Sequence, residues 1–365
     1  MRVSQRYIYR QILLAVLFVS IGFLALFFFF DTVSELSFAG RNNHDYSPSS
    51  AMLYVGLLLP SHAYELLPIT VLIGSIYVMS SMAQSSEFTI LRTSGLSPAQ
   101  ALRTLLWLGL GFAVLTFVLG DYVAPASERM AQQQKAAIEG KLTTGRTGAW
   151  MKERLGDHDR IVNVQELLPT GEMRQVRIFD FNPQGLLQEV IRAESATLEG
   201  EHWQLRQVER STVIPDNERQ QLDRAIQDSM PLATTIRQDM VSSALLDPDR
   251  MSTLDLYTYI NHLQSNKQSA QSYQIKFWHK VFYPFSCLVM MMLALPFAYL
   301  HFRSGAISSA VFGGVIVGIS FFLLNNVFGY IGNLNHWRPW LAAASPAIIY
   351  SFLSLGAFGW LVLRR

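Results

Sequence analysis

The sequence predicts an α-helical membrane protein with six transmembrane helices and an inserted all-β domain of jellyroll-like type. Half of the 365 residues are apolar and only 15% are charged, whereas about a quarter of the residues are charged in soluble domains. Six apolar runs approach or exceed the roughly 20 residues that cross a bilayer as a helix. The charged and polar residues gather instead in one central segment, where short strands alternate with turns.

The first apolar run, residues 12–30, follows the basic residues Arg2, Arg6 and Arg10. A cleaved signal peptide is the alternative, since Ser37-Phe38-Ala39 resembles a cleavage site. Signal-peptide cores usually hold only about 7–15 apolar residues, and cleavage follows closely behind them. We therefore expect an uncleaved first transmembrane helix.

Two further spans are expected at residues 66–82 and 101–120. The approach to the second span, residues 57–67, contains Pro60 and is expected to be a broken or interfacial segment. The third span is expected to start with Ser97 as the helix cap and Pro98 at the first helical position.

Residues 82–95 separate these two spans and are expected to form a short amphipathic helix at the membrane surface, ended by Gly95. It carries one acid, Glu87, and one base, Arg92. Two interpretations of Glu87 stay open: a solvated surface charge, or a contact with an arginine of a cytoplasmic partner. The apolar residues expected together on one side are Phe88, Leu91 and Ile90.

The central segment, residues 121–274, differs in composition from both flanks. Residues 121–141 are expected to form a helical stalk, and strands are expected from about residue 145. Residues 182–185 are expected to form a turn, and the strands at 195–198 and 203–208 a hairpin. The pattern of short strands favours a small sandwich, jelly roll or barrel. A helix is expected again at residues 252–266.

The last three spans are expected at residues 278–299, 306–330 and 340–363. The domains are therefore a first membrane half at residues 1–120, a β domain with its stalk at 121–274, and a second membrane half at 275–365.

Charge counting predicts the orientation. On the side of the membrane without the termini, the short loops hold two bases, Arg41 and Arg338, and three acids. The other side holds more bases and fewer acids, so the positive-inside rule places both termini and the Glu87 helix in the cytoplasm. The β domain is then periplasmic in a bacterium. The cytoplasmic side holds a single acid, Glu87, against these bases: Arg2, Arg6, Arg10, Arg92, Arg103, Arg303, Arg364 and Arg365.

The sequence argues against an enzyme. It contains no G-x-x-x-x-G-K-[ST], no H-E-x-x-H and no G-x-S-x-G motif, so no catalytic residue is assigned and energy for transport would come from a partner. Cys287 is the only cysteine, which excludes an internal disulfide. The spacing in Asp157-His158-Asp159 matches no metal motif, so no metal and no cofactor are expected in this chain.

A basic cluster opens the fourth span. Lys276, His279 and Lys280 share one helical face by their spacing, and aromatic residues surround them. Two interpretations stay open: an interfacial aromatic belt with snorkelling bases, or a cationic rim for an anionic lipid head group.

Small residues repeat at every fourth position of the fifth span, ending in Gly314 and Gly318. They indicate a close helix-packing face, which serves either packing within the chain or a seam with a partner or gate. Ionisable residues near the spans are further candidates, although most are expected at the interface. The polar residues in or near the spans are Asp31, Glu35, His62, Glu65, Asn325 and Asn326.

The order of several short motifs carries a family resemblance. The chain resembles the YjgP/YjgQ family of lipopolysaccharide export permeases, and within it the LptG branch more than the LptF branch. The branch preference rests on Val123-Ala124-Pro125, on Trp150 with Lys152, and on Tyr273-Gln274. Further motifs are Arg6-Tyr7-Ile8, Ser86-Glu87, Ser94-Gly95, Ala244-Leu245-Leu246-Asp247-Pro248, Ala294-Leu295-Pro296-Phe297, Arg303-Ser304-Gly305 and Pro339-Trp340-Leu341-Ala342.

The resemblance implies a subunit of an ATP-driven ABC transporter that extracts lipopolysaccharide from the inner membrane and passes it to a periplasmic bridge. It implies an LptF-like permease, an LptB-like ATPase dimer and an LptC-like single-span protein as partners. In that reading residues 82–95 are a coupling helix, whose candidate residues are Glu87, Phe88, Leu91 and Arg92.

The first and fifth spans would form a lateral gate in such a transporter. Asp31 then matches a family acid, but Phe28 occupies the position of a lysine that some relatives direct at substrate phosphates. Head-group recognition would need other bases here, such as Arg41, Lys276 or Lys280. The full set of substrate and gate candidates is Phe28, Phe30, Asp31, Arg41, Lys276, His279, Lys280, Gly314 and Gly318. A permease for another lipid or lipoprotein, and a non-transport scaffold for a periplasmic bridge, are the alternatives.

Overall fold

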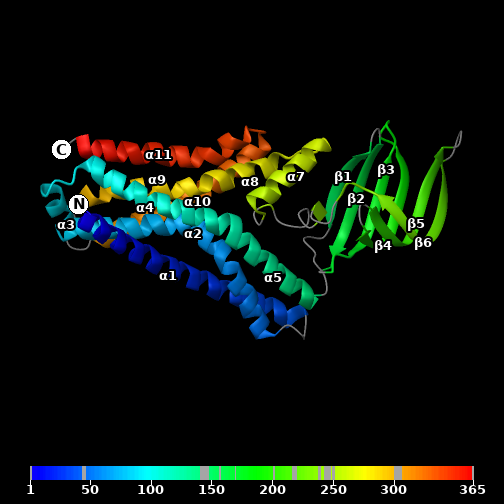
Figure 1. Cartoon of the computed structure of the whole chain (residues 1–365), viewed down its shortest axis with the longest axis horizontal. Coiled ribbons are helices and arrows are strands. Elements are labelled where there is room, and N and C mark those ends of the chain that lie inside the picture. The colour runs from blue at the N-terminus through cyan, green and yellow to red at the C-terminus, as the bar shows by residue number, and fades with distance from the viewer. Residues whose placement is uncertain are drawn as a thin grey trace. The chain divides into compact units, whose positions relative to one another are not determined.

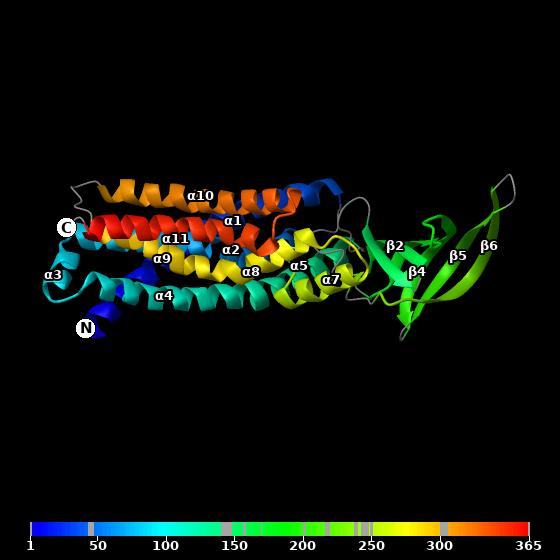
Figure 2. The same ribbon diagram turned by 90° about the horizontal axis from the view of Figure 1, so that it is seen from above.

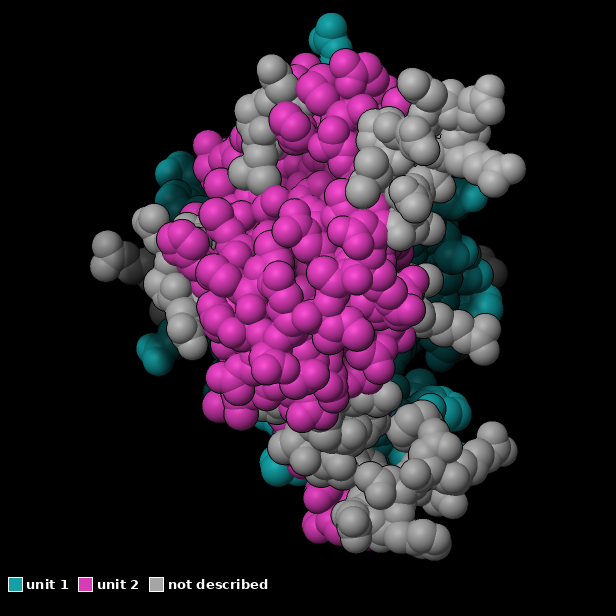
Figure 3. Space-filling view, turned by 90° about the vertical axis from the view of Figure 1, so that its right-hand side faces the viewer, with its two compact units in different colours: residues 1–38, 51–128, 271–365 teal, residues 39–50, 129–270 magenta. Residues whose placement is uncertain are grey.

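A computed structural model describes residues 2–42, 47–139, 148–155, 158–168, 170–199, 202–215, 220–236, 240–241, 248, 251–299 and 306–363. The chain divides into two compact units, which are coloured separately in Figure 3. The first comprises Met1–Phe38, Ala51–Glu128 and Gln271–Arg365, and the second Ala39–Ser50 and Arg129–Ala270. The predicted fold class is confirmed, because the described residues include six helices apolar enough to cross a membrane and a six-stranded antiparallel sheet.

The first unit is a helical bundle (Figures 1 and 2). The short helix α3 lies at the end of the bundle where α1 begins and α11 ends, in both views. The long helices of the first membrane half are α1 (Arg2–Asn42), α2 (Pro48–Gln84) and α4 (Pro98–Val118), with α3 at Glu87–Thr93 and a π-helix, η1, at Leu119–Val123. The second half contains α8 (Gln271–Phe282), η3 (Tyr283–Phe285), α9 (Ser286–Ala294), η4 (Leu295–Tyr299), α10 (Ala306–Leu334) and α11 (Pro339–Leu363).

Helix α2 is the centre of this bundle. In its most apolar stretch 78% of the residues are buried, whereas the corresponding values for α1 and α10 are 11% and 22%. The apolar side chains of α2 therefore pack mostly within the chain, whereas most apolar side chains of α1 and α10 are not buried.

Residues 57–67 were expected to be broken or interfacial. The break is wrong, because α2 continues as a helix through Pro60 and Pro68, and the interfacial alternative stays a prediction. A proline removes one backbone hydrogen bond and disturbs the turn before it. Two side chains donate hydrogen bonds to carbonyls in those turns: Ser127 Oγ to Leu57 O, and Tyr283 Oη to Glu65 O. These bonds tie the turns before both prolines to neighbouring elements, and they lie one residue after Gly56 and Tyr64, whose carbonyls lose their helical partner.

The fourth span is interrupted instead. Its α-helical turns pass through the short 3-10 segments η3 and η4, each of which contains a proline, Pro284 and Pro296. Tyr299 ends η4 and is buried.

The second unit holds the six-stranded sheet, with strands in sequential order and all neighbours antiparallel. This described order is a meander, whereas a double-sheet jelly roll has Greek-key connections. The strands are β1 (Ala149–Leu155), β2 (His158–Leu167), β3 (Met173–Phe181), β4 (Leu187–Glu199), β5 (His202–Pro215) and β6 (Gln220–Ala233).

One predicted strand pairing and one predicted turn of the β domain are confirmed. Strands β4 and β5 pair with Leu198 opposite Trp203, as the hairpin prediction requires. In the turn at 182–185, Gly185 donates its N–H to Asn182 O at 2.9 Å and adopts φ +79°, which favours glycine.

The core of the sheet centres on fully buried Trp203, whose indole N–H donates a hydrogen bond to Ile236 O at 2.9 Å. Helices α5 (Ala124–Glu139) and α7 (Thr253–Ser265) flank the sheet in sequence and confirm the helices expected in those regions. Ser252 caps α7 through a capping box with Asp255.

Candidate functional site

The candidate coupling helix is α3, and its C-terminal end is fixed by backbone hydrogen bonds. Gly95 adopts φ +100° and donates to Arg92 O, while Leu96 donates to Leu91 O, both at 3.0 Å. These two bonds form a Schellman motif, which favours glycine at the residue that leaves the helix. The prediction that Gly95 ends the helix is confirmed.

The start of α4 is fixed by hydrogen bonds between side chains and backbone. Ser97 and Gln100 form a reciprocal capping box, and Pro98 occupies the first turn. This start was predicted correctly. The turn between α3 and α4 is therefore a defined structure, so that α3 has a specified direction at the end of the bundle.

The buried side of α3 faces the bundle. Phe88 is 2% exposed and belongs to the core formed by the helices of this unit, and Leu91 packs against the same core. Ile90 is 62% exposed, so the prediction that it shares their side is wrong. At about 100° per residue, Leu91 lies about 60° from Phe88 around the helix, whereas Ile90 lies about 160° away.

The charged residues of α3 both contact aromatic residues of the bundle. Tyr7 of α1 donates a hydrogen bond to Glu87 Oε2 at 3.1 Å. The guanidinium carbon of Arg92 lies 5.1 Å from the centre of the Tyr299 ring, within the range of a cation–π interaction. The edge of Phe88 meets the same ring, with centroids 5.1 Å apart.

The candidates near the opposite end of α1 form a separate group. Oδ2 of Asp31 in α1 lies 2.7 Å from Nε2 of His62 in α2. The centroids of the His62 and Phe27 rings are 4.8 Å apart. Phe28 is partly buried and Phe30 is 60% exposed. Arg41 lies near the end of α1, and its side chain is outside the described residues.

The basic cluster of α8 is partly buried and engaged within the bundle. Lys280 Nζ donates a hydrogen bond to Gly120 O at 3.1 Å, and the His279 ring lies 5.1 Å from that of Tyr283. Lys276 is also partly buried and makes contacts of its own. The Lys280 bond anchors the fourth span to η1, whereas the His279 contact lies within the fourth span.

The small-residue face of α10 packs on α2. A Cβ atom at Gly314 would lie 2.7 Å from Ile76 Cδ1, and one at Gly318 would lie 2.8 Å from Ile69 Cγ2. Gly318 therefore favours this close approach, whereas at Gly314 the nearest atom is the flexible end of the Ile76 side chain. The face accordingly serves packing within the chain, which was one of its two interpretations.

The outward sides of α1 and α10 carry large exposed apolar residues. Such sides meet either lipid, a partner helix or an apolar ligand. On α1 they include Leu14, Leu17, Phe18, Ile21, Phe29 and Phe30, and on α10 Phe312, Ile316, Ile319, Leu323 and Val327.

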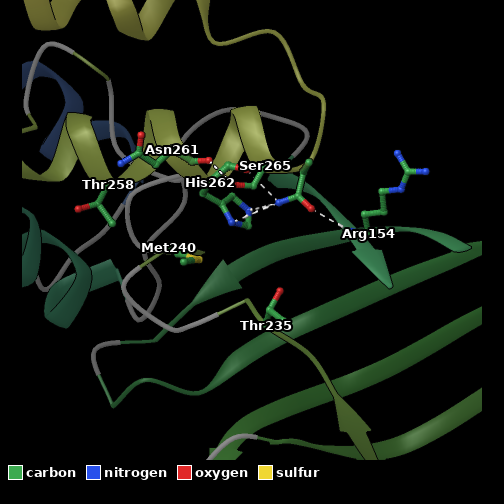
Figure 4. A pocket seen from close by; sticks show the side chains of 8 residues that line it. Arg154, Thr235, Met240, Thr258, Asn261, His262 and Ser265 are labelled. Carbon is green, nitrogen blue, oxygen red and sulfur yellow. Dashed lines mark hydrogen bonds between the residues drawn. The ribbon is translucent and has the colours of Figure 1, made fainter. Parts of the chain in front are cut away.

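The second unit contains an open cavity of about 560 Å³ between α7 and the sheet (Figure 4). Asn266 lines this cavity. Its Oδ1 accepts a hydrogen bond from Arg154 N at 2.9 Å, and its Nδ2 donates to His262 O at 3.0 Å. Asn266 thus joins α7 to the edge strand β1. The lining residues are Arg154, Thr235, Met240, Thr258, Asn261, His262, Ser265 and Asn266.

Sequence reasoning missed two residues at α3, Tyr7 and Tyr299. Tyr7 belongs to the motif Arg6-Tyr7-Ile8, but that motif does not indicate which residue Tyr7 contacts. Tyr299 follows Pro296 by three residues, and only the change from α-helix to 3-10 helix after α9 brings it beside α3.

Known proteins resemble the whole chain. The sequence model of the family described as lipopolysaccharide export system permease LptF/LptG matches residues 6–364. The lipopolysaccharide export system permease protein LptG of Escherichia coli strain K12 is 28% identical over 367 residues, covering 100% of this chain and 98% of that protein. The LptG protein of Haemophilus influenzae strain Rd is 26% identical over 364 residues, covering 99% and 98% respectively.

Proposed function

Because this chain belongs to the LptF/LptG family of lipopolysaccharide export system permeases, we propose that it is the permease subunit of an ATP-driven lipopolysaccharide transporter. It would extract lipopolysaccharide from the inner membrane and pass it to a periplasmic bridge. A partner ATPase would hydrolyse the ATP, and this chain would bind neither nucleotide nor metal. The proposed partners are an LptF-like permease, an LptB-like ATPase dimer and an LptC-like single-span protein.

The observation that carries the proposal is the placement of α3. It lies at one end of the bundle, with Phe88 buried and Ile90 exposed on the opposite side. Glu87 and Arg92 connect it to α1 and to η4. An ATPase that contacts the exposed side of α3 would therefore move a helix that is tied to several spans.

The charge distribution supports the orientation of this site. Arg6, Arg10, Arg92 and Arg103 belong to the α3 end of the bundle, against the single acid Glu87. The positive-inside rule assigns this end to the cytoplasm, where ATP is available, and the β domain to the periplasm.

The exposed apolar sides of α1 and α10 suit the acyl chains of the substrate. Closure of the ATPase dimer would push α3, and the spans would then close on the acyl chains and expel the lipid toward the periplasmic bridge. Head-group contacts would use Arg41, Lys276 or Lys280, because the apolar Phe28 offers no charge to a phosphate.

The test is extraction of a tagged chain in mild detergent, followed by native mass spectrometry of the complex and its lipid. We expect one related permease, two ATPase copies and a ligand that contains lipid A. A complex that contains another lipid or a lipoprotein would show that the proposed substrate is wrong. A chain that carries phospholipid alone would favour a non-transport scaffold for a periplasmic bridge.

The Glu87→Arg variant tests the coupling site in the same preparation. We expect the ATPase to be lost or ATP-driven release of lipopolysaccharide to fall at least tenfold, because the proposed contact of Glu87 with an arginine of the ATPase would become repulsive. Glu194→Arg is the matched control, since Glu194 is an exposed residue of β4. Intact assembly and transport with Glu87→Arg would remove the coupling role of this residue.

A further inference from the structure

We propose that Tyr299 is the positioning residue through which α3 acts on the second membrane half. The inference deepens the proposed function and rests on it, because it concerns how movement of α3 reaches the spans. Tyr299 lies outside the coupling helix, and its role follows from the contacts of its ring.

The Tyr299 ring joins elements that are far apart in the sequence. Phe88 of α3 meets it edge to face at 5.1 Å, and Arg92 of α3 lies over it at 5.1 Å. Phe358 of α11 approaches it edge to face with centroids 6.5 Å apart. One side chain at the end of the fourth span therefore contacts both the coupling helix and the sixth span.

The position of α3 depends on this contact. A helix of seven residues is too short to be stable by itself, so its direction is set by its caps and by packing. Phe88 and Tyr299 are 2% and 4% exposed, and both belong to the same core. Because such cores are close-packed, α3 cannot shift toward the bundle unless the Tyr299 ring shifts with it.

Tyr299 also belongs to a segment suited to transmit such a shift. Pro296 stands within η4, where the backbone leaves the α-helical geometry of α9. Leu295 is fully buried and Ala298 is 5% exposed. A displacement of η4 is therefore passed along the packed fourth span.

The second connection of α3 is weaker. Tyr7 and Glu87 are linked by one hydrogen bond between side chains that are not buried. Water can replace such a bond at little cost, whereas it cannot replace an aromatic ring in a core. Tyr7 also belongs to α1 in the first membrane half, so among the ring and side-chain hydrogen-bond contacts described for α3, those with Tyr299 reach the second half.

The test compares Tyr299→Phe and Tyr299→Leu in the full complex with the partner permease and the ATPase, reconstituted in vesicles that contain lipopolysaccharide. Phenylalanine keeps the ring and the cation–π contact with Arg92, whereas leucine keeps only the apolar bulk. The readouts are assembly, kcat and KM for ATP, and lipopolysaccharide released per ATP hydrolysed. Tyr122→Leu is the control. Tyr122 is an exposed tyrosine of η1 that contacts Phe117 of α4, at the opposite end of the third span from α3.

We expect Tyr299→Phe and Tyr122→Leu to stay within twofold of the unmodified complex. Tyr299→Leu should assemble with an unchanged KM for ATP but release at least tenfold less lipopolysaccharide per ATP. Normal release per ATP with Tyr299→Leu would overturn the inference.

Two further variants decide the question if Tyr299→Leu does not assemble. Arg92→Gln and Phe358→Leu each remove one contact of the ring, and each should lower release per ATP about threefold. Unchanged ratios in both would overturn the inference. A failure of the proposed function is recognised separately, because the unmodified complex would then contain no ATPase or release no lipopolysaccharide.

Discussion

The Asp31 carboxylate of α1 lies 2.7 Å from Nε2 of His62 in α2, so the two helices that differ most in burial are joined by a polar contact. Both side chains are partly exposed, at 31% and 21%. The contact is a hydrogen bond in any protonation state in which one proton lies between the two atoms. It fixes α1, whose apolar residues are mostly unburied, against the central helix.

The first prediction concerns this contact. Asp31→Ala should lower the thermal unfolding temperature only slightly, because a partly exposed pair contributes about 0–1 kcal/mol. It should have a larger effect on the mobility of α1, measured by spin labels on single cysteines in α1 and α2. Asp31→Asn, which keeps a hydrogen-bonding group, is the control. Equal label mobility in the alanine and asparagine variants would contradict a holding role for the contact.

The second prediction compares two glycines of the third span and its extension. A Cβ at Gly120 would lie 2.2 Å from the Tyr64 ring, whereas one at Gly111 would have no neighbour within 4 Å. Gly120→Ala should destabilise the protein by about 1–3 kcal/mol through overpacking. Gly111→Ala should be neutral or stabilise by up to about 1 kcal/mol, because alanine favours helix. Thermal unfolding in one detergent measures both, and similar midpoints would contradict the packing seen at Gly120.

The fold was predictable where a local pattern determines the structure. Gly95, Ser97 and Pro98 act through the backbone of their own turn, so their roles could be inferred from neighbouring residues alone. The six apolar runs were predictable because the membrane sets their length.

The contacts of the candidate site were less predictable, because they depend on residues distant in the sequence. Ile90 is an exception: it was placed on the wrong side of α3 although the 100° per residue of an α-helix puts it about 160° from Phe88. The hydrogen bonds that α5 and η3 donate to the turns before Pro60 and Pro68 come from distant residues, so no local pattern indicates them. Tyr299 could not be identified for the same reason.

The third prediction concerns the β domain. Trp203 is fully buried and its indole donates to Ile236 O, so Trp203→Ala should cost about 3–5 kcal/mol in that unit. Limited proteolysis of the full chain should then cut within the strands, while the membrane helices remain protected. Trp150→Ala is the matched control, because Trp150 of β1 is 50% exposed. Equal resistance of the two variants would contradict the central position of Trp203.

The fourth prediction concerns the carbonyl of Glu65, in the turn before Pro68 of α2. Tyr283 of η3 is buried and donates its hydroxyl proton to this carbonyl. Tyr283→Phe keeps the ring and removes only the donor, which should cost about 0.5–1.5 kcal/mol, the usual net contribution of one hydrogen bond. Tyr350→Phe is an informative comparison, since the Tyr350 hydroxyl is also hydrogen-bonded within the bundle, to Ser320 at 2.6 Å, but serves no proline-containing turn. Both variants should lower the unfolding temperature in detergent, but only Tyr283→Phe should increase hydrogen exchange of the α2 backbone around Glu65. Unchanged exchange there would show that the turn before Pro68 is held without the tyrosine.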